Sequence, residues 1–134
     1  MRADIAAAKP AKGPYDVKLA PGGLVDLEFL VHFVQLRDRL ALGPDLGAAI
    51  ATLTTVGALP PGLGAAHDLL TRFLLLLRLV APGAAVPDAY APAVEAMLAR
   101  GLGAASFPAC SAALTAARAA VRLAYSDILQ SKRN

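Results

Sequence analysis

Apolar residues recur at steps of three and four along most of the chain, and strong helix breakers separate the stretches in which they do so. This spacing predicts amphipathic helices, because residues three and four apart lie on one face of a helix. Runs such as GALPPG and APGAAVP supply the breaks between them. The sequence therefore predicts an all-α fold, a bundle of five to six helices over residues 24–41, 46–56, 63–80, 92–101 and 107–130.

Single residues mark the expected helix ends. Asp45 and Ser106 each precede a helix and are expected N-caps, because their side-chain oxygens can accept hydrogen bonds from the first amides. Gly43 and Pro44 are expected to stop the first helix. That helix carries a second apolar stripe that includes Leu36, so we expect it to be central and packed on more than one side.

The last helix carries a continuous apolar stripe of alternating steps of three and four. Such a stripe predicts a face that lies against the core from one end of the helix to the other. Its members are Phe107, Cys110, Leu114, Ala117, Val121, Ala124 and Ile128.

Residues 1–23 read as an arm ahead of the bundle. Six prolines and glycines between positions 10 and 23 prevent a continuous helix there. Within the arm, YDVKL alternates apolar and polar residues, which suits a short extended segment or an edge strand. We therefore divide the chain into a short irregular or extended arm, 1–23, and a helical bundle domain, 24–134.

Composition excludes several classes of protein. The apolar stretch 69–81 is shorter than the roughly 20 residues that cross a bilayer, so no membrane partner is expected. Thirteen basic and ten acidic residues are scattered without a basic stripe, which argues against nucleic-acid binding. A single cysteine and the lack of a signal peptide favour a cytoplasmic protein. A charged share of only 17% suggests that some apolar surface belongs against another domain or chain.

Familiar catalytic patterns are absent from the sequence. It holds no Cys/His pairing for zinc, no phosphate-binding glycine loop and no nucleophile elbow. His32 and His67 are isolated and are expected to be core or surface histidines, and Cys110 an inert packed thiol. Arg118 and Arg122, one helical turn apart, are expected at a solvated or partner-facing edge. The three tyrosines show no spacing that suggests a joint role.

The stretch KLAPGGLVDLEF places two carboxylates where a helix begins. Asp26 and Glu28 would point about 200° apart on a regular helix, so they cannot form a close acid/base dyad. From the residues alone, Asp26 is expected to interact with the free amides and positive end of the helix. Glu28 is expected to pair with a basic residue such as Arg2 or Lys18.

The longer stretch YDVKLAPGGLVDLEFLVHFVQLR closely resembles the signature that follows the nucleotidyltransferase domains of the glutamine synthetase adenylyltransferase family. The family pattern reads roughly fDlKxxpGGlvDiEFlvQyl, with a glutamine where His32 stands. The segment TLTTVGALPPGLGAAHDLLTRFLLLLRLV resembles the next two helices, but TRFLLLLRLVA replaces a more polar YrFLRxxEhrLQ-like run. Matching positions of the signature are Lys18, Gly22, Gly23, Asp26, Glu28 and Phe29.

This resemblance implies the C-terminal helical portion of a bifunctional enzyme that adenylylates and deadenylylates glutamine synthetase in nitrogen regulation. Its partners would be a missing N-terminal nucleotidyltransferase domain, glutamine synthetase and the PII signalling protein. The parent enzyme would use ATP and magnesium. The Gly-Ser pair and paired aspartates that hold them in the superfamily are absent here. We therefore expect no catalytic residue, metal or cofactor in this chain, and no activity from the chain alone.

The resemblance also gives the opening turn a functional interpretation. Lys18 and the amides around Gly22 and Gly23 are expected to face nucleotide phosphates or the missing domain, because glycine permits close backbone approach and lysine offers a point charge. Asp26 and Glu28 would anchor the turn or form salt bridges to that domain. The alternatives are a non-catalytic helical module that binds glutamine synthetase or PII, and an independent helical adaptor that shares the motif.

Overall fold

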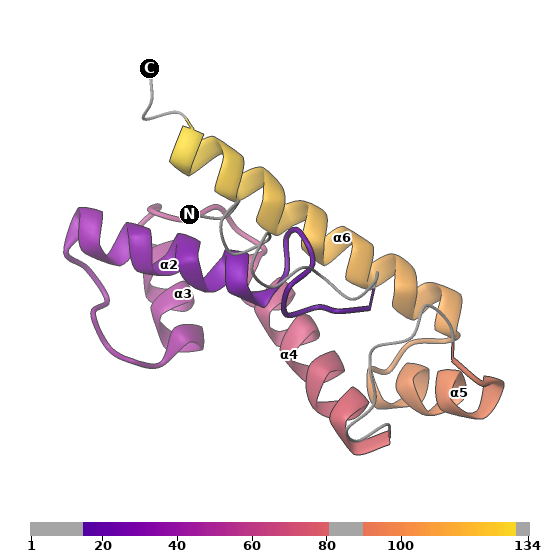
Figure 1. Ribbon diagram of the computed structural model, residues 1–134. Coiled ribbons are helices and arrows are strands. Elements are labelled where there is room, and N and C mark those ends of the chain that lie inside the picture. Colours follow the sequence, from indigo (N-terminus) through magenta and orange to yellow (C-terminus); the bar gives the residue numbers. More distant parts are fainter. Residues whose placement is uncertain (1–14, 81–89, 131–134) are drawn as a thin grey trace.

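A computed structural model of the chain describes residues 15–80 and 90–130 (Figure 1). The described residues form five α-helices and one π-helical turn, and they contain no strand. The predicted all-α fold of five to six helices is therefore confirmed. The elements are α2 (Leu24–Asp38), α3 (Leu46–Thr55), α4 (Leu63–Val80), α5 (Pro92–Gly101), α6 (Phe107–Tyr125) and η1 (Ser126–Gln130).

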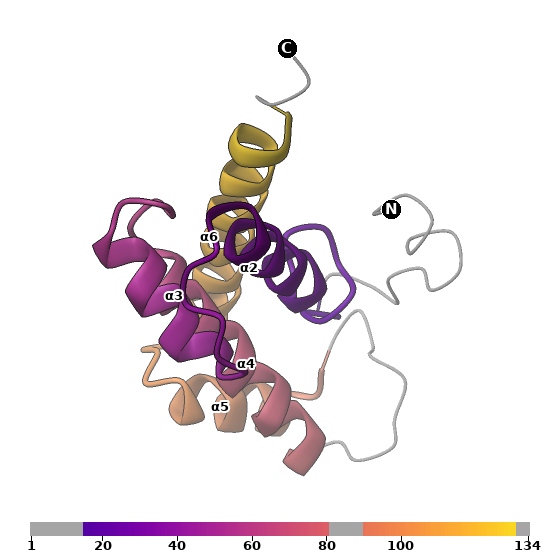
Figure 2. The same ribbon diagram turned by 90° about the vertical axis from the view of Figure 1, so that its left-hand side faces the viewer.

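Helices α4 and α6 form the centre of the bundle. They share the most extensive contact between any two helices, and α5 packs on both. Helix α2 contacts α3, α4 and α6, and it lies near the end of α6 opposite to α5 (Figure 1). In Figure 2, which looks onto the side where α2 and α3 lie, these two helices stand in front of α6. The side chains that the packing removes completely from solvent include Leu27, Leu30, Leu70, Phe73, Leu98 and Val121.

Helix α2 ends earlier than the sequence predicts. Its last residue is Asp38, and Arg39 takes a left-handed conformation with φ of 54°. The Leu40 amide then donates to the Gln35 carbonyl over 3.3 Å, which closes the last turn. The prediction that Gly43 stops the helix is wrong, because this left-handed residue ends it before the glycine is reached.

The second apolar stripe of α2 is only partly buried. Phe29 and Phe33 are half-buried, whereas Leu36 is 75% and Leu40 40% exposed. The helix packs on three others, as expected for contact on more than one side. It is nevertheless not the central helix, a position that α4 and α6 occupy.

Both predicted side-chain caps are confirmed. The Asp45 carboxylate accepts a hydrogen bond from the Ala48 amide over 3.0 Å, at the start of α3. The Ser106 hydroxyl accepts one from the Ala109 amide over 3.3 Å, at the start of α6. The core stripe of α6 is also confirmed, with its end members half-buried and its inner five buried: Cys110, Leu114, Ala117, Val121 and Ala124.

The described part of the arm is a chain of turns, so the predicted edge strand is wrong for these residues. The Val17 amide donates to the Tyr15 carbonyl and the Ala20 amide to the Asp16 carbonyl. No strand lies beside them in the described residues, and Val17 and Ala20 are instead buried among helices. Residues 1–14 lie outside the described part. The division into domains 1–23 and 24–134 stays a prediction.

Large apolar side chains also lie on the surface. No helix in the described ranges is long and apolar enough to span a membrane. An exposed apolar surface instead suits contact with another protein, so the expectation of a further contact stays a prediction. The large apolar side chains that are more than half exposed are Leu36, Leu42, Val56, Leu75, Leu79, Met97 and Leu123.

Candidate functional site

Residues 16–23, which we name the motif turn, form one hydrogen-bonded unit with the start of α2. The carbonyl oxygens of Val17 and Lys18 accept from the amides of Leu24 and Val25 over 2.8 and 3.0 Å. These amides open the helix and have no partner inside it. Gly23 is the N-cap and its position has no side-chain cap, so the backbone of the motif turn caps α2.

Packing explains both glycines of the motif. A Cβ atom on Gly22 would lie 2.2 Å from the Arg118 carbonyl oxygen of α6, and Gly22 also has a φ of +78°. A Cβ atom on Gly23 would lie 2.3 Å from the Val17 carbonyl oxygen. Real Cβ atoms do not approach this closely, so both positions need a residue without a side chain.

The amides of the two glycines are already used inside the motif turn. The Gly22 amide donates to the Asp26 carboxylate over 2.7 Å, and the Gly23 amide donates to the Ala20 carbonyl over 2.8 Å. Neither N–H group is thus left over for a phosphate. Gly22 makes its close backbone approach to α6, whereas Gly23 makes its approach to the Val17 carbonyl of the motif turn itself.

Asp26 and Glu28 lie on opposite sides of α2, as their spacing predicts. Asp26 is buried in the first turn, at the positive end of the helix as expected, and it accepts the amide of Gly22 just ahead of the helix. The first amides of α2 bond instead to carbonyls of the motif turn. The Glu28 side chain is 59% exposed. The two carboxylates therefore do not form an acid/base dyad.

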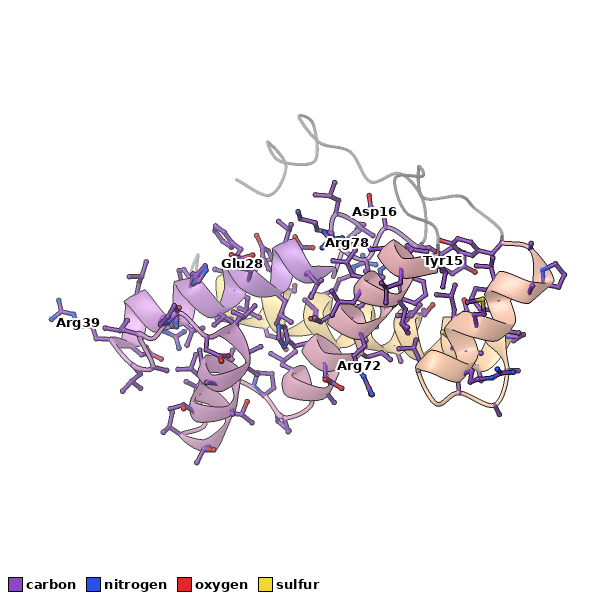
Figure 3. The ribbon with its side chains drawn as sticks, turned by 90° about the horizontal axis from the view of Figure 1, so that it is seen from below. Tyr15, Asp16, Glu28, Arg39, Arg72 and Arg78 are labelled. Carbon is purple, nitrogen blue, oxygen red and sulfur yellow. The ribbon has the colours of Figure 1, made fainter. Side chains whose placement is uncertain are left out.

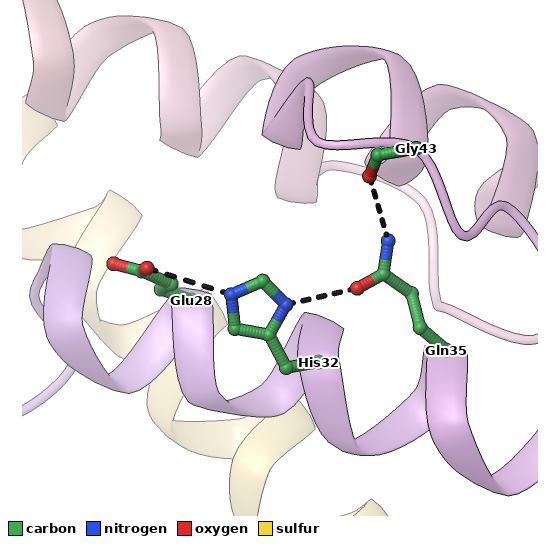
Figure 4. A network of polar contacts seen from close by, with 4 residues as sticks. All are labelled: Glu28, His32, Gln35 and Gly43. Atoms are coloured by element: carbon green, nitrogen blue, oxygen red, sulfur yellow. Dashed lines mark hydrogen bonds and ion pairs between the residues drawn. The ribbon is translucent and has the colours of Figure 1, made fainter.

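Glu28 takes part in a polar chain along the surface of α2 (Figure 4). Its carboxylate lies 3.4 Å from His32 Nε2, and His32 Nδ1 lies 2.9 Å from Gln35 Oε1. The Gln35 amide group donates onward to the Gly43 carbonyl. Among the described residues Glu28 therefore pairs with His32 and not with Lys18, while Arg2 is outside them. His32 is a surface histidine, as expected.

Helix α6 holds the other side of the motif turn. Arg118 Nε donates to the Pro21 carbonyl over 3.1 Å, although the two residues are 97 positions apart in the sequence. Arg118 is half-buried, and this bond ties it to the chain's own motif turn. Arg122 beside it is exposed, as expected for a solvated edge.

An aromatic cluster anchors the start of the motif turn. The Tyr15 ring lies 6.2 Å from Phe73, 5.3 Å from Tyr90 and 5.6 Å from Phe107, measured between ring centroids. Burial, with the charge of Tyr15 as a second cause, raises the pKa of Tyr90 to about 12. Sequence reasoning missed this cluster, because its members come from four separate parts of the chain.

A groove lies beside the motif turn, and we name it the motif groove. It has a volume of about 250 Å³. Figure 3 shows Glu28 and Arg78 on the same edge of the molecule, and both line this groove. In the described part of the chain no hydrogen bond or ion pair engages the Lys18 ammonium or the Arg78 guanidinium. The residues that line the motif groove are Lys18, Leu24, Val25, Glu28, Leu46, His67, Thr71, Leu74 and Arg78.

The structure thus divides the five predicted site residues into two sets. Lys18 and Glu28 are exposed and line the motif groove, while Gly22, Gly23 and Asp26 are buried behind it. Whether any of them faces a nucleotide or another domain stays a prediction.

Sequence reasoning missed the wall of the groove that α4 supplies. His67, Thr71, Leu74 and Arg78 follow one another at steps of four, three and four, and so lie on one face of α4. That spacing is visible in the sequence, but an apolar helix gives no sign of which face remains open.

No three His, Cys, Asp or Glu side chains gather as a metal site anywhere in the ranges 15–80 and 90–130. Cys110 is buried in the core, as predicted, and burial raises the pKa of its thiol. The motif groove itself holds one carboxylate beside two cationic side chains. Magnesium requires several oxygen ligands and is repelled by cations, so these residues do not fit it.

Comparison with known proteins gives the relatives of the chain. In an alignment of 129 positions that covers 91% of its length, the chain is 34% identical to the bifunctional glutamine synthetase adenylyltransferase/adenylyl-removing enzyme of Caulobacter vibrioides. The chain is therefore a homologue of one segment of this family. The enzyme of the same name from Xanthobacter autotrophicus is 33% identical over an alignment of 138 residues, and that from Mesorhizobium japonicum 39% over 82 residues.

These alignments cover 97% and 59% of this chain, respectively. The chain spans only 8% to 14% of the length of the three relatives. These matches confirm the family resemblance that the motif predicts. No protein-family model matches the chain, and no solved structure gives a significant match.

Proposed function

We propose that this chain is the C-terminal helical portion of a bifunctional enzyme that adenylylates and deadenylylates glutamine synthetase in nitrogen regulation. In this proposal the chain supports an adjoining nucleotidyltransferase domain, which carries the chemistry. The names of the relatives and the shared motif support the assignment. The proteins it matches are many times longer than the chain, which is why the activity of the whole enzyme is proposed and not observed for the segment.

The way the motif turn is held is the observation that carries the proposal. The aromatic cluster, α6 and α2 fix the motif turn from three sides, while Lys18 and Glu28 remain exposed. A fixed turn can present a charged group in one place at little cost in conformational entropy. Lys18 and Glu28 then face the nucleotidyltransferase domain, and Gly22, Gly23 and Asp26 support them from behind.

ATP and magnesium belong to the nucleotidyltransferase domain in this proposal. Adenylyl transfer needs carboxylates that hold metal ions at the reacting phosphate, and we expect those carboxylates outside this chain. The assembled enzyme is cytoplasmic, with glutamine synthetase as its substrate and the PII protein as a regulator. The isolated chain should transfer no AMP to glutamine synthetase, and calorimetry should detect no micromolar ATP binding.

Two steps test the proposal. The DNA that flanks the coding sequence should encode, in frame, a domain with a Gly-Ser pair and paired aspartates. In the protein so encoded, Lys18→Ala should lower the rate of AMP transfer to glutamine synthetase roughly ten-fold, because a hydrogen bond to a charged group contributes about 1.5–3 kcal/mol. Arg100→Ala, an exposed basic residue on α5, is the matched control and should keep the wild-type rate.

The contrary result is equally clear. A wild-type rate for Lys18→Ala, at unchanged thermal stability, would contradict a role beside the active site. Binding of glutamine synthetase or PII that survives in this variant would then favour the alternative, a non-catalytic interaction module.

A further inference from the structure

The motif groove carries more positive than negative charge. Lys18 lies on the motif turn and Arg78 near the end of α4, and neither side chain has a polar partner in the described ranges. Among the described residues Glu28 is the one acidic residue of the groove, and its carboxylate lies 3.4 Å from His32. Two cationic side chains against one carboxylate favour a bound anion.

Apolar surface adjoins these charges. Leu24, Val25 and Leu74 line the groove itself. On α4, Leu75 is 52% exposed and lies three residues before Arg78, so it adjoins the lining residues of this helix. A surface with an apolar floor and a cationic rim is complementary to a protein segment that combines an acidic and an apolar side chain.

The size of the groove suits a side chain of a partner protein. Sites for drug-sized ligands and cofactors have volumes of roughly 300–1,000 Å³. The motif groove, at about 250 Å³, lies just below this range. Its volume suits one or two side chains of a partner.

We propose that the motif groove docks an acidic segment of the adjoining nucleotidyltransferase domain. An aspartate or glutamate of that segment binds Lys18 and Arg78, and an apolar neighbour packs against Leu74 and Leu75. The inference rests on the proposed function, and it names the chemistry of the contact. The relatives contain most of their length outside the matched segment, so a partner within the same enzyme is available to cover this surface.

Calorimetric titration of the 134-residue chain with the nucleotidyltransferase domain encoded beside it tests the inference. Arg78→Glu should weaken binding at least ten-fold, because it sets like charges against each other across the contact. Leu75→Ser should weaken it by a smaller factor, roughly three- to five-fold. Raising the salt concentration should weaken wild-type binding more than binding of Arg78→Glu.

Arg100→Glu is the matched control. Arg100 is an exposed basic residue on α5, and it does not line the motif groove. This variant should bind within two-fold of wild type, and circular dichroism should show that all variants are folded. Equal binding by wild type and Arg78→Glu would overturn the groove contact while leaving the proposed function intact. Failure of the wild-type chain to bind the domain would overturn the proposed function as well.

Discussion

The two glycines of the motif are needed for different reasons. Gly22 combines a left-handed backbone conformation with contact against the α6 backbone, whereas Gly23 has an extended conformation and lies against the Val17 carbonyl. At both positions the constraint is the space for a Cβ atom. Gly22 is therefore required by tertiary packing, and Gly23 by the local geometry of the turn.

Gly22→Ala should lower the free energy of unfolding by about 2–5 kcal/mol. The left-handed conformation costs an L-residue about 1–2 kcal/mol, and overpacking against α6 adds about 1–3 kcal/mol. Gly57→Ala is the control, because Gly57 has a similar φ of +81° but nothing within 4 Å of a Cβ atom. It should lose only the cost of the left-handed conformation, about 1–2 kcal/mol. Urea unfolding measures both, and equal losses would mean that α6 does not constrain Gly22.

At the scale of elements, helix starts follow from local residues more faithfully than helix ends. Asp45 and Ser106 are read directly as caps, because each needs only an amide three residues ahead. Helix α2 instead begins on backbone carbonyls of the motif turn and ends at a left-handed arginine. Neither a cap made of backbone carbonyls nor a left-handed arginine has a strong signature in a single sequence.

Asp45→Ala should lower the free energy of unfolding by about 1 kcal/mol, because the α3 amide loses its side-chain acceptor. Asp45→Asn keeps an oxygen in the same place and should lose no more than a few tenths. Urea unfolding followed by circular dichroism compares the two. A full loss in the asparagine variant would contradict the capping role and indicate that the charge itself matters.

For the whole molecule, α6 is the element that joins three of the other four described helices to the motif turn. It contacts α2, α4 and α5, and Arg118 binds the motif turn. Cys110 lies on the buried stripe of this helix. Solvent can reach this buried face of α6 only when the core as a whole unfolds. The reactivity of Cys110 therefore measures unfolding of the core.

A thiol reagent at pH 8 should label Cys110 at least about a hundred-fold more slowly in the native chain than in urea. Burial removes access, and the raised pKa of the thiol lowers the fraction of reactive thiolate. Ala113→Cys places a second thiol on the exposed side of α6 and should react at once. Fast labelling of Cys110 in the native wild type would contradict a closely packed centre.

Much of the candidate site was visible in the sequence. The motif identified Lys18 and Glu28, which are exposed, and the helical spacing separated Asp26 from Glu28 correctly. The contacts that hold the motif turn in place could not be predicted from the sequence. Arg118 contacts Pro21, and Tyr15 contacts Phe107, across long separations in the sequence, and no local pattern encodes such contacts.

The sequence by itself determined the helical class, the starts of the helices, the buried face of α6 and the family of the segment. Those properties depend on spacing along one helix, on a side chain and an amide three residues apart, or on a contiguous motif. Only the tertiary structure decided that α4 and α6 form the centre, that α6 holds the motif turn, and that Arg78 joins Lys18 in one groove. The reason is physical: which apolar face is buried depends on what the other helices cover, and that depends on the whole chain at once.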